Sequence, residues 1–185
     1  MDALFTSTLV VTLAEIGDKT QLLALILAAR FSQRGLLILG ITLATLINHG
    51  LSAWFGSWLS SWIPAEWYGW IIGGTFILLG LWLLIPDQEE DVDKGIFKYG
   101  AFVAAFVLFF IAEIADKTQV ATVALAARFD DLSAVVIGTT VGMLVANIPV
   151  IYAGRWLLQK IPLKLMHWIA CGVFVLFGIL TIWMA

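Results

Sequence analysis

The sequence predicts an all-α membrane protein with six transmembrane helices, arranged as two three-helix repeats of inverted topology. Hydrophobic residues make up 62% of the 185 residues and charged residues only 12%, which is typical of a polytopic membrane protein. Apolar runs long enough to cross a bilayer recur along the chain. In addition, residues 14–31 and 112–129 are near-copies of each other. No basic patch suggests a nucleic-acid partner, and the single cysteine, Cys171, excludes an intramolecular disulfide.

The six predicted spans lie at residues 4–29, 36–57, 67–86, 99–127, 133–157 and 166–184. Each span is long enough, at about 1.5 Å per residue, to cross roughly 30 Å of hydrocarbon. The first and fourth spans carry the duplicated segment, and the third and sixth begin next to tryptophans that suit a membrane interface. The links hold the helix breakers and most of the charges. The N-terminus has no positively charged segment and no evident cleavage site, so we expect it to remain as the first span.

The duplication extends over three spans. AEIGDKTQLLALILAARF and AEIADKTQVATVALAARF agree at twelve of eighteen positions with an offset of 98 residues, and the same offset pairs Gly40 with Gly138 and Trp70 with Trp168. We therefore divide the chain into a first repeat (1–86), an acidic linker (87–98) and a second repeat (99–185). Three spans are an odd number, so the second copy must enter the membrane from the opposite side, as in many secondary transporters.

Basic residues predict the orientation. Seven lie in or beside the first, third and fifth links, and Arg128 alone lies on the opposite side. The seven are Arg30, Arg34, Lys94, Lys98, Arg155, Lys160 and Lys164. Because basic residues favour the cytoplasmic side, we expect both termini outside and the acidic central loop in the cytoplasm.

The duplicated motif puts ionisable residues near the middle of two membrane spans, where each costs at least about 2.5 kcal/mol. On a regular helix Glu15, Asp18 and Lys19 would share one narrow stripe, with Gln21 at its edge and Thr20 nearly opposite. This stripe is expected to face the bundle interior. A buried ion pair that fixes helix register is the alternative, but the duplication disfavours it.

The two copies together predict a hard, oxygen-rich cation site. Its proposed metal ligands are Glu15, Asp18, Glu113 and Asp116. Possible further ligands or coupling groups are Thr20, Gln21, Thr118, Gln119, Lys19 and Lys117. Such a site suits Ca²⁺, Mg²⁺ or Mn²⁺ better than copper or thiolate-bound zinc. Four acids and two lysines leave two negative charges, which one divalent cation or two protons would neutralise, although sodium would satisfy the same balance.

Other polar residues in the spans are weaker candidates. Asn48, His49 and Asn147 lie mid-span, where interhelical hydrogen bonding is a better explanation than ion contact. Gly17 could loosen the first helix and free carbonyl ligands, whereas Ala115 replaces it in the second copy, so we expect any such break to be one-sided.

The doubled Glu-x-Gly-Asp-Lys-Thr/Ser motif, on the first and fourth of six spans with an acidic central link, resembles the Gdt-type manganese/calcium transporter family. The resemblance covers nearly the whole chain. It implies a bacterial inner-membrane exporter of Mn²⁺, with Ca²⁺ second, which exchanges the ion for protons by alternating access at a midplane site. It also implies metal binding by the Glu and Asp of both motif copies, with the metal as substrate and with no cofactor. EIADKT departs from the pattern at Ala115.

Two alternatives use the same residues differently. A proton-coupled exporter of a small organic solute would need the acids only for coupling, and a nontransporting membrane scaffold would tolerate their neutralisation. We do not expect an enzyme, because His49 and His167 lack metalloprotease spacing and no Ser/His pair is credible. Oligomeric state is not predicted by these patterns.

Overall fold

The computed structural model describes residues 2–85, 94–154, 156, 160 and 162–184, and every regular element among them is a helix. The first half contains α1 (Ala3–Glu15), α2 (Lys19–Arg30), α3 (Arg34–Ser60) and α4 (Ala65–Trp82). The second half contains the 3₁₀ helix η1 (Lys94–Tyr99), α5 (Gly100–Glu113), α6 (Lys117–Arg128), α7 (Leu132–Ala153) and α9 (Leu163–Trp183). The acidic run at residues 87–93 lies outside the described residues.

Four helical segments of the described chain are long and apolar enough to cross a membrane: α3, Gly95–Glu113, α7 and α9. The prediction of continuous helices at 4–29 and 99–127 is wrong, because each is interrupted between its motif Glu and its motif Lys. Gly17 and Ala115 have φ angles of 89° and 60°, a left-handed conformation that a continuous right-handed helix cannot contain. The first predicted span is therefore two short helices, of which α1 is apolar.

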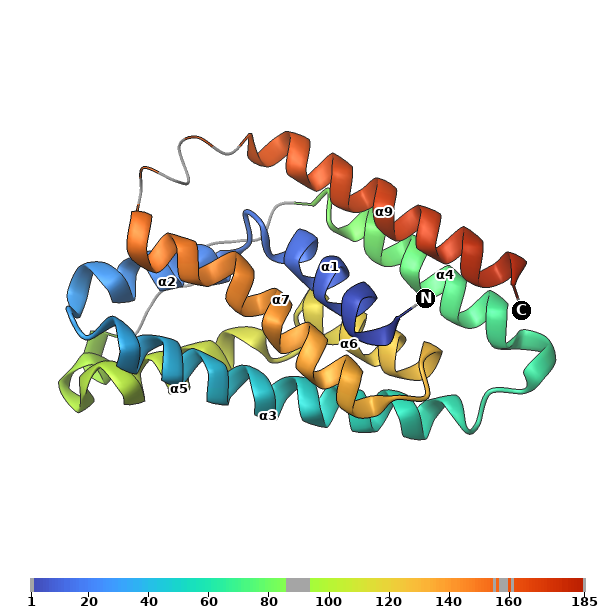
Figure 1. The fold of residues 1–185 in the computed structure, drawn as a ribbon, viewed down its shortest axis with the longest axis horizontal. Coiled ribbons are helices and arrows are strands. Elements are labelled where there is room, and N and C mark those ends of the chain that lie inside the picture. Colours follow the sequence, from blue (N-terminus) through green and yellow to red (C-terminus); the bar gives the residue numbers. More distant parts are fainter. Residues whose placement is uncertain (1, 86–93, 155, 157–159, 161, 185) are drawn as a thin grey trace.

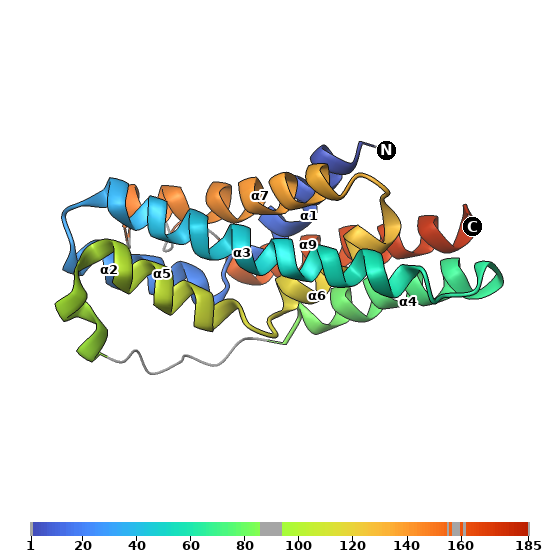
Figure 2. The same ribbon diagram turned by 90° about the horizontal axis from the view of Figure 1, so that it is seen from below.

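The helices form an elongated bundle in which α1 and α2 follow one another along the long axis (Figure 1). Three close pairs organise it: α1 packs against α7, α5 against α3, and α4 against α9. Figure 2, turned by 90°, shows α3 and α7 running lengthwise beside the interrupted helices. The polar motif residues are thereby enclosed by apolar helices.

Glycines make these close pairs possible. A Cβ at Gly40 of α3 would lie 2.7 Å from the carbonyl oxygen of Phe102 on α5. At Gly138 of α7 it would lie 2.6 Å from the carbonyl oxygen of Leu4 on α1. Gly73 on α4 and Gly178 on α9 do the same, because a Cβ at either would lie 2.5 Å from the carbonyl oxygen of the other. Small residues at contacts of this kind are typical of membrane helices.

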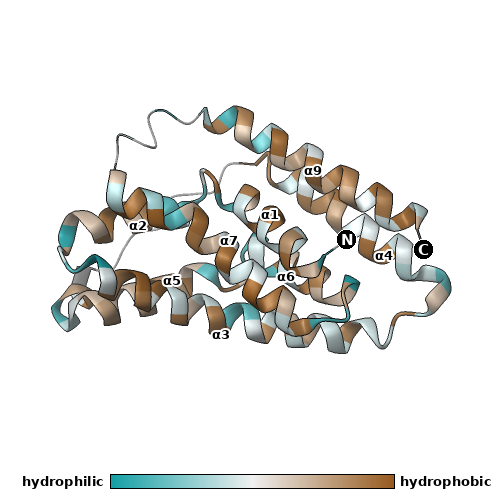
Figure 3. Cartoon of the chain, viewed as in Figure 1, coloured by the Kyte–Doolittle hydropathy of each residue, from teal (hydrophilic) through white to brown (hydrophobic). Residues whose placement is uncertain are grey.

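The outer surface suits lipid. In Figure 3, α9 is mostly hydrophobic, α4 combines hydrophobic residues with residues of intermediate hydropathy, and many hydrophilic residues lie near helix ends and at the interruptions. Large side chains are widely exposed, including Trp54, Leu78 and Trp183, the last at 83%. A water-soluble protein rarely exposes so much contiguous apolar surface. Cys171 is buried, as expected for a small apolar thiol.

Candidate cation site at two interrupted helices

Both copies of the motif form the same local structure. The chain leaves α1 at Glu15, turns at Gly17 and begins α2 at Lys19, and the second copy repeats this around Ala115. A glutamine from the following helix stabilises each turn: the Gly17 N–H donates to Gln21 Oε1 (2.9 Å) and the Ala115 N–H to Gln119 Oε1 (3.2 Å). The interruption is therefore present in both copies, and the expectation of a one-sided break was wrong.

The motif glutamates are completely buried, each with one oxygen held and one oxygen available. Thr20 Oγ1 donates to Glu15 Oε2 at 2.6 Å, and Thr118 Oγ1 donates to Glu113 Oε2 at 3.0 Å. The Oε1 atoms of both glutamates have no hydrogen-bond partner among the described residues. Thr20 is not opposite Glu15, as a regular helix would require, because the turn at Gly17 rotates α2 relative to α1.

The two copies meet inside the bundle. Lys19 Nζ of the first copy lies 3.3 Å from Asp116 Oδ2 of the second. α1 packs against α6 and α2 against α5, so the interruptions lie side by side. Glu15 interacts electrostatically with Glu113 and Asp116, and Glu113 interacts with Asp18. The acids of the two copies therefore lie within electrostatic range of one another, at the ends of α1 and α5 and at the starts of α2 and α6.

The lysines of the two copies are placed differently. Lys19 reaches across to Asp116, whereas Lys117 Nζ donates to the carbonyl oxygen of Ile85, just beyond the end of α4, at 2.9 Å. Among the described residues, no group of three or more His, Cys, Asp or Glu side chains is arranged closely enough to hold a metal. In this structure the acids of the two copies thus lie as two separate groups, one at each interruption.

The interruptions also supply backbone groups. The C-terminal carbonyls of α1 and α5 and the N-terminal N–H groups of α2 and α6 end beside the acids. Such ends carry partial charges in a medium where few other polar groups exist. Discontinuous helices in secondary transporters use these groups to coordinate ions.

The weaker candidates have mixed outcomes. Asn48 Nδ2 donates to the carbonyl oxygen of Phe110 on α5 at 3.0 Å, the interhelical role expected of it. Asn147 Nδ2 instead donates within α7, to the Met143 carbonyl at 3.1 Å. His49 is completely buried, and neither ring nitrogen has a hydrogen-bond partner among the described residues.

Sequence reasoning missed the cover over the first interruption. A Cβ at Gly17 would lie 3.0 Å from His167 Nε2 and 3.1 Å from Leu163 Cδ2, both on α9. The repeat counterparts of His167 and Leu163 are Gly69 and Ala65 on α4, so the two sequences do not resemble each other here. No signal in the sequence pointed to this contact.

Comparison with known proteins identifies the family. The model of the family described as "Divalent cation/proton antiporter GDT1" matches residues 3–91 and 101–185. A Vibrio cholerae protein named "Putative manganese exporter" is 44% identical over 98% of this chain and 90% of its own length. A GDT1-like protein of Synechocystis is 28% identical over 95% of this chain and 94% of its own. GDT1-like protein 5 of Arabidopsis thaliana is 28% identical over 95% of this chain and 93% of its own length. No solved structure matches. The chain is an integral membrane protein that belongs to the GDT1 family of divalent cation/proton antiporters.

Proposed function

We propose that this protein exports Mn²⁺, and Ca²⁺ as second choice, from the cytoplasm in exchange for protons. The acids Glu15, Asp18, Glu113 and Asp116 would bind the ion, while the threonines and glutamines that follow them hold the glutamates and the turns in place. The observation that carries this proposal is the pair of buried glutamates, each with an available Oε1, at two interruptions bridged by Lys19 and Asp116. Carboxylate and carbonyl oxygens suit Mn²⁺ and Ca²⁺.

Proton exchange agrees with the charge balance of the site. The four acids and the two motif lysines carry two negative charges when fully ionised, and the same groups can be neutralised by one divalent ion or by two protons. The two species therefore compete for the same oxygens. If the carrier changes its facing only when these oxygens are neutralised, such competition couples the movements of the two species in opposite directions without a second binding site.

Reconstitution into liposomes tests this function. An imposed Mn²⁺ gradient should drive proton movement in the opposite direction, with a smaller response to Ca²⁺. The response should persist without Na⁺. A sodium requirement would contradict proton exchange. Proton flux that depends on an organic solute and ignores every divalent ion would favour the solute exporter, and an absence of any flux would favour the scaffold.

We further propose that residues 1–86 and 99–185 are inverted repeats joined by the linker at 87–98. The packing supports this, because exchanging the repeats converts the α1–α7 contact into α5–α3 and the α1–α6 contact into α5–α2. The two segments matched by the family model also coincide closely with the two repeats. Inverted repeats provide two oppositely facing halves around one site, as alternating access requires.

The proposed orientation has both termini outside and the acidic link in the cytoplasm of a bacterial cell, with the protein in the inner membrane. It rests on the distribution of basic residues. In a Cys171→Ala background, an impermeant thiol reagent added to intact cells should label a cysteine at residue 184 and should not label one at residue 90. Labelling of the cysteine at residue 90 alone would show that the orientation is the opposite of the proposed one.

The two repeats differ in ways that indicate how the access could alternate. α9 packs against α1 and covers Gly17, whereas α4 packs against α6 and Ala115 is exposed. Among the described helices, α4 does not pack against α5 to a comparable extent, and α9 does not pack against α2 to a comparable extent. A second state would result if each repeat adopted the packing now seen in the other. In that state Ala65 and Gly69 of α4 would cover Ala115, and α9 would no longer cover Gly17.

Cysteine pairs distinguish the two states. Leu163 Cβ lies 3.6 Å from the position of a Cβ at Gly17, which is within the range for a disulfide. In a Cys171→Ala background, Gly17→Cys with Leu163→Cys should cross-link readily. The repeat-equivalent pair, Ala115→Cys with Ala65→Cys, should cross-link only under conditions that populate the second state, such as a reversed Mn²⁺ gradient. Failure of the second pair under every gradient, in protein that still transports, would exclude this movement.

A further inference from the structure

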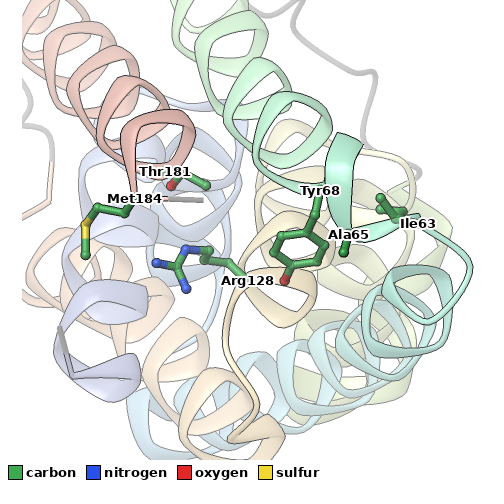
Figure 4. Close-up of a pocket in the computed structure, with 6 residues that line it drawn as sticks. All are labelled: Ile63, Ala65, Tyr68, Arg128, Thr181 and Met184. Atoms are coloured by element: carbon green, nitrogen blue, oxygen red, sulfur yellow. The ribbon is translucent and has the colours of Figure 1, made fainter.

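A cavity of about 420 Å³ lies away from the motif acids, between the start of α4, the end of α6 and the end of α9 (Figure 4). Ile63, Ala65 and Tyr68 line it from the α4 side, Arg128 from α6, and Thr181 and Met184 from α9. Its volume is within the range of small-molecule binding sites. Among the described residues that line the cavity, Arg128 is the charged one.

The Arg128 guanidinium is available to a ligand. Figure 4 shows it between Met184 and Thr181 on one side and Tyr68 on the other. Arg128 stacks on the Phe129 ring at 5.7 Å and makes no ion pair with any described residue. The Tyr68 hydroxyl donates to the carbonyl oxygen of Ala127, which fixes that wall of the cavity.

The acidic residues that the structure describes near this site do not line the cavity. Glu66, beside Ala65, is exposed, and so is Asp130, which interacts electrostatically with Tyr68 without lining the cavity. Asp131 accepts hydrogen bonds from Ser133 Oγ and the Ala134 N–H at the start of α7. The N-terminus of α4, with its partial positive charge, adds to the positive potential of Arg128.

Tryptophans place the cavity at the depth of lipid headgroups. Each of three lining residues, Ile63, Tyr68 and Met184, is adjacent in sequence to an exposed tryptophan. These are Trp62, Trp67 and Trp183, exposed by 70%, 58% and 83%. Tryptophans with this exposure in a membrane protein favour the interface between hydrocarbon and water.

We propose that this cavity binds the phosphate of an anionic phospholipid headgroup. Arg128 would form the charge-assisted hydrogen bonds to the phosphate, and Ile63 and Met184 would contact the glycerol and upper acyl region. Guanidinium is well suited to phosphate because its N–H groups match two phosphate oxygens at once. A free anion would gain nothing from the apolar wall or from the tryptophans, and this favours the lipid as the source of the phosphate.

The repeat provides a matched control. Arg30 is the counterpart of Arg128, ends a helix of the same length and stacks on Phe31 at 6.0 Å, but it is exposed. Met184, exposed by 63%, offers a second position at the rim of the cavity. Glutamate there would repel phosphate, whereas glutamine of the same size would not.

Native mass spectrometry of the full chain with phosphatidylglycerol, phosphatidylcholine or inorganic phosphate tests the site. The wild type should retain phosphatidylglycerol in preference to phosphatidylcholine. Arg128→Gln and Met184→Glu should each weaken retention on the order of tenfold, the usual scale for one charged hydrogen-bonded contact. Arg30→Gln and Met184→Gln should retain the lipid as the wild type does.

Three outcomes would overturn the proposal. Equal loss in Arg30→Gln would mean non-specific attraction to basic residues. Unchanged retention in both Arg128→Gln and Met184→Glu would place the lipid elsewhere. Displacement of the lipid by millimolar inorganic phosphate would make the cavity a site for free anions instead. Because none of these variants alters a motif residue, the result is independent of the proposed cation transport.

Discussion

Glu15→Gln and Glu113→Gln should each reduce Mn²⁺-driven proton flux by about 100-fold or more, with the protein still folded and inserted. Each glutamate is completely buried and offers one oxygen that has no hydrogen-bond partner among the described residues. Removing one carboxylate from a buried site that binds a divalent cation costs roughly 3 kcal/mol or more of ion stabilisation, which corresponds to that factor. Glutamine keeps the shape and can still accept the threonine hydrogen bond, so the loss would report the missing charge.

The aspartates should behave in the same way, for a related reason. Asp116→Asn removes the partner of Lys19, and Asp18→Asn changes the equivalent position of the other half-site. Liposome flux at saturating Mn²⁺ is the measurement, with thermal unfolding as a check on folding. Glu66→Gln, at an exposed acid on α4, is the matched control and should transport normally. Normal flux in any two of the four carboxylate variants would rule out a shared four-carboxylate site.

Gly17→Ala and Ala115→Gly should change stability in unequal and opposite ways. Both residues occupy a left-handed conformation, which costs a residue with a Cβ about 1 to 2 kcal/mol. At residue 17 a methyl group would also press against His167 and Leu163. Gly17→Ala should therefore lower the free energy of unfolding by roughly 1 to 2 kcal/mol and slow transport. Ala115→Gly relieves existing strain, partly offset by glycine entropy, and should be neutral or stabilising by at most about 1 kcal/mol.

Thermal unfolding of both variants in the same detergent checks this pair. Adding His167→Ala to Gly17→Ala should restore the stability that is lost through the close contact with His167. The stability that is lost through the left-handed backbone should not be restored. If Ala115→Gly is destabilised as much as Gly17→Ala, the left-handed backbone is not the reason for the glycine at residue 17. A fully stable Gly17→Ala protein with normal flux would make the glycine incidental.

The sequence predicted the all-helical membrane class and the acids that the structure places at the two interruptions. Hydropathy indicates spans because backbone N–H and C=O groups in lipid must be hydrogen-bonded within a helix. The duplication alone pairs Glu15 with Glu113. The bridge between Lys19 and Asp116 shows that the two copies do meet. Even the glutamines, predicted as possible ligands, lie at the site, although they stabilise the turns.

The interruptions could only be predicted in part, because they depend on side chains that stabilise an unfavourable backbone. Gly17 suggests a turn, but nothing about Ala115 does, since alanine is the best helix former. Its conformation is held by Gln119 across the turn, and by Asp116, which accepts from the Lys117 N–H at the start of α6. The pattern of a regular helix also misplaced Thr20, which contacts Glu15 only because α2 is rotated.

Anomalous scattering from crystals grown with Mn²⁺ would locate the bound ion. We expect one Mn²⁺ between the two interruptions, with oxygens of Glu15 and Glu113 within about 2.5 Å of it, and loss of that signal in a Glu15→Gln/Glu113→Gln protein. Mn²⁺ bound only elsewhere, such as at the acidic residues 87–93, with the signal unchanged in the double variant, would contradict it.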